Sequence, residues 1–373
     1  MARALSPEQV RRLRLRAQRL GSPPDDVVPR VADIVRDAAG IQAQEMPAAA
    51  LSVRARGAGL TAADIERALV DERSIVWTWG QRGTLHLLPA EDIGWLLPLL
   101  GPIFNRPSRR RLELGLDEEI GARGVRAIRD LLAGRGPLTR AELAWHLSAR
   151  GIPTAGQAMA HLIHRAALEG VICRGPNRGS KPTYVLLDDW IGRGRAVPRE
   201  AALAELAYRY LAAYGPARPE DLVAWSGLPL RDARTGWERI ADQLLEVEID
   251  GRAAWMLKER AGWLDEPPAN SPVVRLLPRF DTYLLGYRTR DLAVAPEHAS
   301  RILPGGGLIH SVIIADGRAV GTWKHAKKRD SLEVLVEPFD GLAPDLLPGL
   351  EEEVKDVGRF LGMPASMRVV APT

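Results

Sequence analysis

The sequence has almost no cysteine and no long run of uncharged residues. Cys173 is the only cysteine among 373 residues, so an internal disulfide is excluded and the composition fits a reducing compartment. No uncharged stretch reaches the ~18 to 20 residues that a helix needs to cross a bilayer. The first residues also lack the apolar segment of a signal peptide. These absences predict a cytoplasmic protein.

Positive charge is only slightly in excess, but it is clustered. Lys and Arg total 51 against 47 Asp and Glu, which gives a formal net charge of +4 and a pI near 9.4. The cations concentrate in three groups: Arg11, Arg12, Arg14, Arg16 and Arg19; Arg106, Arg109, Arg110 and Arg111; Lys324, Lys327, Lys328 and Arg329. One such cluster is often a solvated face, whereas several on one chain favour a polyanion such as nucleic acid as partner.

One order of predicted elements occurs three times. Helices followed by a β-hairpin, the order of a winged helix, are indicated within residues 1–115, 116–197 and 198–266. Gly136-Pro137 and Gly215-Pro216 occupy matching places in the second and third copies. Because the chain is too long for one typical core, this repetition favours tandem winged helices over one large domain.

The hairpins and the C-terminal segment carry recognisable turn signals. Asp250-Gly251 and Asp316-Gly317 predict two-residue turns with positive φ angles. A third-copy helix is expected over 230–244, and a last helix over 348–361. Strand-like runs after residue 267 predict a separate domain at 267–373. The expected fold class is therefore α+β, with three tandem winged helices and a C-terminal α+β domain.

The polar triplet Gln42-Ala43-Gln44 lies between apolar segments. Gly40 is expected to end the helix that precedes it. Residues two apart share a face in extended backbone and not in a helix, so two cooperating glutamines predict an extended or turned triplet. Two interpretations remain open: the amides bond main chain between packed helices, or they form a functional site.

Several other side chains have both a structural and a functional interpretation. His161 and His164 have ligand spacing, but zinc needs two more ligands and no cysteine pair or neighbouring His-Glu motif is present, so no metal site is predicted. Trp77 and Trp79 share a strand face, where they belong to a core or stack on bases. His86 is either a satisfied structural histidine or, beside Arg82, a DNA contact.

Three stretches together resemble the AlkZ-like DNA glycosylases, bacterial winged-helix proteins that excise alkylated bases and unhook interstrand crosslinks. These are the triplet, the segment from Trp77-Thr78-Trp79 to His86, and the segment from Leu276-Leu277-Pro278-Arg279-Phe280-Asp281 to Arg288. The active-site signature of that family is glutamine, an apolar residue, then glutamine or aspartate. Gln42 and Gln44 match it, so the resemblance implies that both are catalytic.

The resemblance also implies a chemistry that suits amides. Glutamine cannot take up a proton at neutral pH. Purines alkylated at guanine N7 or adenine N3 are already cationic and leave without protonation. Amides can then position water and stabilise an oxocarbenium-like sugar. No cofactor is expected. Lys181 is the nearest lysine to the triplet in sequence, so we expect a monofunctional enzyme.

The expected partner is duplex DNA with alkylated bases or crosslinks, bound by a monomer associated with the nucleoid. Winged helices place their third helix in the major groove and their wing near the backbone. The expected DNA-contacting residues are Arg82, His86, Arg174, Arg178, Lys181, Arg279 and Lys324. Asp281 is expected to hold Arg279 or to cap a turn.

Functions without catalysis stay open. Winged helices also serve as protein-interaction modules. A transcriptional regulator usually dimerises on spaced half-sites, whereas three winged helices in one chain reduce that need. A protein that only shields damaged DNA would have the same composition.

Overall fold

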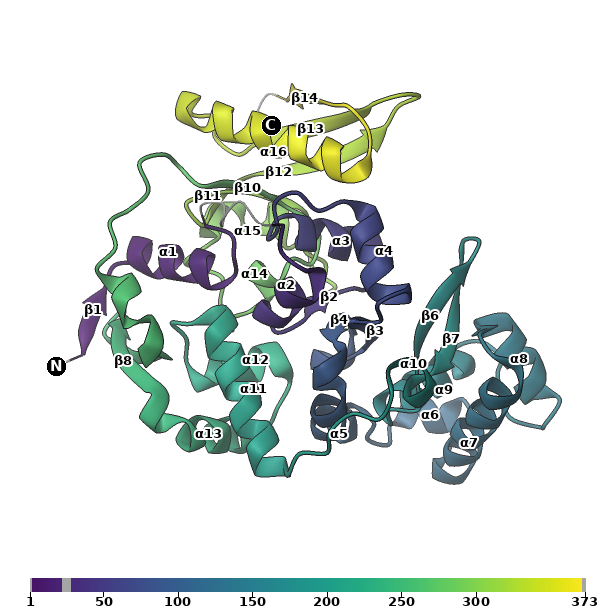
Figure 1. Cartoon of the computed structure of the whole chain (residues 1–373). Helices are drawn as coiled ribbons and strands as arrows, with labels where there is room; N and C mark the ends of the chain where they lie inside the picture. The colour runs from purple at the N-terminus through teal and green to yellow at the C-terminus, as the bar shows by residue number, and fades with distance from the viewer. Residues whose placement is uncertain (1, 22–27, 371–373) are drawn as a thin grey trace.

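The structure is a computed structural model that describes residues 2–21 and 28–370. Three three-stranded sheets and one five-stranded sheet, each with helices against it, make an α+β fold (Figure 1). Within the described residues, no helix is both long and apolar enough to span a bilayer.

The first unit holds the glutamine triplet. Its elements are α2 (Val31–Asp37), β2 (Ile41–Gln42), α3 (Met46–Arg54), α4 (Ala62–Val70), β3 (Ile75–Trp79) and β4 (Leu85–Pro89), with sheet order β2-β4-β3. Gly40 adopts φ +99°, and a Cβ there would lie 2.8 Å from Leu88 Cδ2. The helix ends at Asp37, two residues before its predicted end at Ala39, and the positive φ angles of Ala39 (52°) and Gly40 turn the chain into β2.

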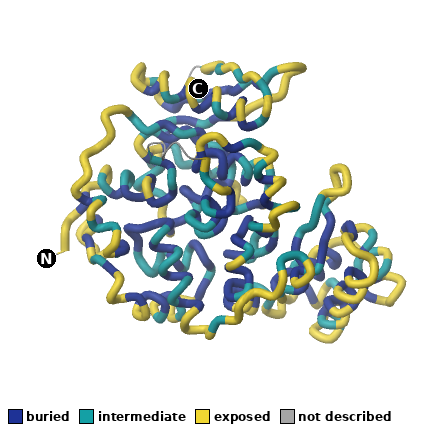
Figure 2. Tube along the Cα trace, viewed as in Figure 1, coloured by how far each residue is buried: buried dark blue, intermediate teal, exposed yellow. Residues whose placement is uncertain are grey.

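The second unit repeats that order. It comprises α7 (Glu118–Arg135), β5 (Leu138–Thr139), α8 (Arg140–Ser148), α9 (Ala158–Leu168), β6 (Ile172–Arg178) and β7 (Lys181–Leu186), with sheet order β5-β7-β6. Thr139 N and Oγ1 lie 2.7 and 2.9 Å from Glu142 Oε2, which is a capping box. The hairpin of β6 and β7 ends in an exposed tip (Figure 2).

The third unit borrows a strand from the N-terminus. Its elements are α11 (Arg199–Tyr214), α12 (Pro219–Ser226), α13 (Leu230–Arg239), β8 (Leu244–Ile249) and β9 (Arg252–Leu257), and β1 (Arg3–Leu5) pairs parallel to β8. The φ angles of 51° and 68° at Asp250 and Gly251 confirm the predicted turn. The helix predicted to reach Leu244 is wrong at its end, because the chain turns after Ile240 and Leu244 begins β8.

The C-terminal unit packs on the first. Its sheet has the order β10-β11-β12-β13-β14, from β10 (Val274–Leu277), β11 (Val312–Ala315), β12 (Arg318–Lys327), β13 (Leu332–Pro338) and β14 (Ala365–Val369), with α16 (Leu347–Leu361) beside it. Ile34 and Leu51 of the first unit share one buried cluster with Leu276, Trp323 and Leu350. The two units therefore share a core, and the predicted domain boundaries remain a prediction.

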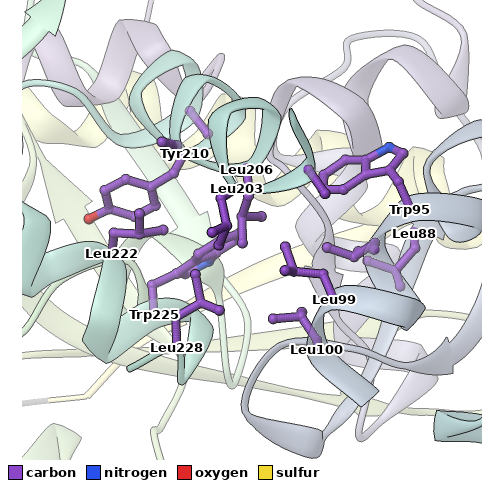
Figure 3. Close-up of a cluster of buried hydrophobic side chains, with 14 of the residues drawn as sticks. Leu88, Trp95, Leu99, Leu100, Leu203, Leu206, Tyr210, Leu222, Trp225 and Leu228 are labelled. Atoms are coloured by element: carbon purple, nitrogen blue, oxygen red, sulfur yellow. The ribbon is translucent and has the colours of Figure 1, made fainter. Parts of the chain in front are cut away.

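A second shared core joins the first unit to the third. The helix α5 (Ile93–Phe104) follows the first hairpin, and its side chains meet those of α11 and α12 (Figure 3). The labelled members are Leu88, Trp95, Leu99, Leu100, Leu203, Leu206, Tyr210, Leu222, Trp225 and Leu228. The first unit thus shares one core with the C-terminal unit and another with the third unit.

Candidate active site

The backbone of the triplet is fixed by strand pairing. Gln42 ends β2 opposite His86 of β4. Ala43 N donates to Leu85 O at 2.7 Å, and Trp77 Nε1 donates to Ala43 O at 3.0 Å. Ala43 is fully buried, whereas Gln42 is partly buried and Gln44 is exposed. The extended conformation predicted for the triplet is therefore present through Gln42.

The amide oxygens of the two glutamines have different partners. Gln44 Oε1 accepts from Leu85 N at 3.3 Å, so this amide bonds main chain of a strand. Gln42 Oε1 accepts from Arg82 Nη2. The structural interpretation, hydrogen bonding to main chain, therefore holds for Gln44, and Gln42 is bonded to a side chain instead. Neither NH2 group donates to a described residue.

Arg82 reaches from the first unit to the third. It lies in the turn between β3 and β4 with a φ of +55°, and its Nη1 donates to Trp225 O of α12 at 2.6 Å. Burial lowers the pKa of this guanidinium below its ordinary value. Among the described residues, the Arg82 guanidinium donates hydrogen bonds to the amide oxygen of Gln42 and to the main-chain oxygen of Trp225.

His86 is buried, with 2% of its surface exposed. Its Nδ1 lies 2.9 Å from Thr84 O, and because a carbonyl only accepts, Nδ1 carries the hydrogen. Burial, with the charge of Arg82 second, lowers its pKa to about 3. The imidazole is therefore neutral at pH 7, and the geometry supports the structural role that the sequence left open.

Arg279 brings the C-terminal unit to the triplet. Its Nη1 lies 3.0 Å from Oε1 of Glu45, the residue directly after Gln44. The two side chains are 37% and 43% exposed, so the pair borders solvent. Sequence reasoning missed Glu45, although its position next to the glutamine signature was the available signal.

Asp281 forms a buried clamp with Arg56. Its two oxygens each lie 2.8 Å from a guanidinium nitrogen, and neither side chain is exposed. Burial alone would raise the pKa of Asp281, but Arg56 and hydrogen bonds hold it below the ordinary value. Asp281 also accepts from Tyr283 N at 2.9 Å, so it caps α14 (Thr282–Leu285) as one of the two predictions had it. Its arginine partner is Arg56 and not Arg279.

The second unit covers the two tryptophans of β3. The guanidinium carbon of Arg174 lies 5.1 and 5.8 Å from the rings of Trp77 and Trp79, and 4.7 Å from that of Tyr184. His164 packs edge-on against Trp79 and places Nε2 3.2 Å from Gly83 O. The tryptophans therefore belong to a junction between units, and the histidine serves that junction.

Three predicted DNA contacts lie outside this junction. Arg178 pairs with Glu142 at 2.6 Å on the second hairpin, and Lys324 of β12 pairs with Glu337 at 2.8 Å. Lys181 is exposed and lines an open hollow of about 490 Å³ with Arg140 and Arg174 among others. In the part of the chain that the structure describes, none of the three contacts the triplet.

The third helix of the second unit, α9, is partly covered by α5. α9 packs on α5 so closely that a Cβ on Gly101 would meet the Leu168 carbonyl. Most residues of α9 are buried. The C-terminal end of α9 is therefore covered by α5, while Gln157 and Ala160 near its N-terminal end are exposed.

The fold is that of a DNA glycosylase. A family described as DNA glycosylase AlkZ-like matches residues 35–360, and the chain belongs to that family. This confirms the resemblance drawn from the triplet and its companion stretches.

A curated relative and a solved structure agree with this assignment. An interstrand DNA cross-link repair glycosylase of Streptomyces sahachiroi is 32% identical over 351 residues, covering 90% of this chain and 92% of the relative. The solved structure of the Streptomyces sahachiroi DNA glycosylase AlkZ superposes with a TM-score of 0.85 at 30% identity, covering 98% of this chain and all of that one. The α+β fold class is confirmed.

Proposed function

We propose that the enzyme hydrolyses the N-glycosidic bond of cationic alkylated purines in duplex DNA, namely N7-alkylguanine and N3-alkyladenine. Crosslinks joined through such atoms are included, since the Streptomyces relative is named for crosslink repair. The main observation behind this proposal is the pair of glutamines that flank the buried Ala43. Arg82, which binds Gln42, also binds the third unit, and Glu45 beside Gln44 pairs with Arg279 of the C-terminal unit.

The proposed chemistry needs no proton donor for the base. The bond between C1′ and the base nitrogen breaks, and its electron pair neutralises the positive charge of the purine. Water then forms a bond to the electron-poor C1′ and loses a proton to solvent. Gln42 and Gln44 orient the reactants by hydrogen bonds, which suits groups that cannot exchange protons at neutral pH.

The titratable groups around the triplet are consistent with this scheme. His86 is neutral at pH 7 and buried. Glu45, the adjacent carboxylate, is paired with Arg279. Water attack on an oxocarbenium-like carbon requires little base assistance, so neither group has to act as a general base.

The reaction is proposed to stop at the abasic site, without cleavage of the DNA strand. Among the described residues, no lysine contacts the triplet, and a Schiff base with the abasic sugar needs one. We therefore infer a monofunctional glycosylase. Borohydride should trap no covalent complex with the product DNA.

We propose that the protein binds duplex DNA as a monomer and that several cations of the one chain contact its phosphates. The open hollow beside Arg174 and Lys181, the exposed Lys324 and the half-exposed Arg279 offer positive charge on the second and C-terminal units. Contacts to phosphates from two units would fix the strand register without reading sequence.

Single-turnover release of 7-methylguanine from a defined duplex tests the proposal. The wild type should release the base, and Gln42→Ala/Gln44→Ala should slow release by ~100-fold or more. Gln157→Ala, at an exposed glutamine of the second unit, is the matched control and should retain the wild-type rate. Tight DNA binding without release by the wild type would instead indicate a regulator or a lesion-shielding protein.

A further inference from the structure

We propose that Arg82 is a positioning residue that turns the amide of Gln42, so that its NH2 group and not its oxygen faces the reacting atoms. The proposal deepens the glycosylase function and rests on it. Arg82 then acts on the reaction through Gln42 instead of contacting DNA.

The direction of the amide follows from the chemistry of its partner. A guanidinium has N–H donors and no acceptor, so the atom of Gln42 that meets Arg82 must be Oε1. This holds however the two ends of an amide are assigned in a structure. Nε2 therefore points away from Arg82, and it donates to no described residue.

Arg82 is itself fixed at both ends. Its backbone is held in the left-handed region by a turn in which Gly80 N donates to Thr84 O at 2.9 Å and Gly83 N donates to Gly80 O at 3.0 Å. Its guanidinium is anchored by Trp225 O at 2.6 Å. A side chain fixed in this way holds the amide of Gln42 in one orientation.

The anchor on the third unit is rigid. Trp225 is 2% exposed and packs against Tyr210 and Tyr214, with ring centroids 5.3 and 5.5 Å away, inside the core shared with α5 (Figure 3). The orientation of Gln42 therefore depends on the docking of the third unit against the first. An isolated first unit would lack this anchor.

Gln44 shows the same arrangement by different means. Its Oε1 accepts from the Leu85 main-chain N–H, which can only donate, so its NH2 group is also turned away from the strand. A donor hydrogen bond to Oε1 also polarises the amide and strengthens its N–H groups as donors. Such donors suit the acceptor atoms of a purine that gains an electron pair as it leaves.

Gln42→Glu separates this inference from one in which the amide oxygen acts. Glutamate keeps the oxygen that Arg82 binds, adds an ion pair, and has no NH2 group. We expect a rate of 7-methylguanine release ~100-fold below the wild type, as low as that of Gln42→Ala, together with an unchanged or higher Tm. Near wild-type release by Gln42→Glu would overturn the inference, because a carboxylate would stabilise a cationic sugar at least as well as an amide oxygen.

A double-mutant cycle tests the route through Gln42. Arg82→Ala should slow release by ~10- to 100-fold with unchanged DNA affinity, and should slow it no further when Gln42 is already alanine. Arg82→Lys, which keeps the charge, covers the case in which Arg82→Ala fails to fold, and should show the same lack of additivity.

The outcomes distinguish this inference from the proposed function. A direct DNA contact by Arg82 would weaken affinity equally in both backgrounds and would overturn the inference alone. Absence of release by the wild type would overturn the glycosylase proposal and the inference with it.

Discussion

The two ends of α3 are held in opposite ways. Just before the helix, the two glutamines each accept one hydrogen bond through Oε1 and keep their NH2 groups unshared among the described residues. At its other end, Arg54 pairs with Glu353 and Asp356 at 2.9 and 2.8 Å, and both Arg54 and Arg56 are completely buried.

This difference separates the scaffold from the site. Buried ion pairs fix the C-terminal unit on α3, where a lost partner leaves an uncompensated charge. The triplet is positioned by weaker contacts to neutral amides, which leave donors free for a ligand. We therefore expect changes at the clamp to affect stability and changes at the triplet to affect the reaction.

The largest expected effect on stability comes from breaking the buried clamp between Asp281 and Arg56. Asp281→Ala leaves Arg56 buried without its carboxylate and should lower the free energy of unfolding by about 3 to 5 kcal/mol. Asp265→Ala is the matched control, since Asp265 pairs with Arg3 at 2.6 Å but is 77% exposed, and should cost at most about 1 kcal/mol. Urea denaturation measures both. Equal losses would remove the distinction between the two ends of α3.

Acid should weaken the protein through His86 before it weakens the clamp. The folded pKa of His86 lies near 3, below the ordinary 6.5, so the unfolded chain binds the extra proton first. Stability is fully present above pH 6.5 and falls as the pH decreases from there toward 3. Asp281, whose folded pKa is also lowered, loses its contribution only below its ordinary value of 3.8.

Unfolding curves at a series of pH values check this order. The decline between pH 6.5 and 4 should become shallower in His86→Gln, and the part that remains comes from other histidines with lowered pKa values, such as His164. The rate of base release by folded wild type should show no inflection near pH 6.5, because a buried neutral histidine takes no part in proton transfer. An inflection there that disappears in His86→Gln would show that His86 takes part in the reaction.

The smallest expected effect is on the second hairpin. Lys181→Ala should weaken duplex binding uniformly across sequences and reduce the slope of log affinity against log salt by about one, if Lys181 contacts one phosphate. The rate of release from bound DNA should not change. Glu119→Ala, at an exposed acidic residue of α7, should not reduce the slope. A slower reaction in Lys181→Ala at saturating enzyme would place this hairpin in the active site.

Local features of the fold were predictable from the sequence. Turns at Asp250-Gly251 and Asp316-Gly317 have the expected positive φ angles, and Thr139 and Glu142 form a capping box. These signals act over a few residues, so the chain itself encodes them. The extended backbone at Ile41 and Gln42 is local in the same way, because it directly follows the turn at Gly40.

Long-range pairing was not predictable. β1 is three residues long and pairs with β8, which lies more than half the chain away in sequence. No periodicity in the sequence indicates this pairing. Asp281 pairs with Arg56, 225 residues away in sequence, and not with the nearby Arg279. With 51 cations and 47 anions in the chain, local sequence does not say which of them meet. The contact of Arg82 with Gln42 and Trp225 depends likewise on the docking of whole units.

A cationic and a neutral lesion, compared in the same duplex, show directly whether the two glutamines carry the reaction. Single-turnover release of 7-methylguanine and of 8-oxoguanine would be measured with the wild type at saturating enzyme. If two amides without a proton donor carry the reaction, the cationic base is released and the neutral base is not. Comparable release of 8-oxoguanine would contradict the account, because a neutral purine leaves only with protonation that the glutamines cannot provide.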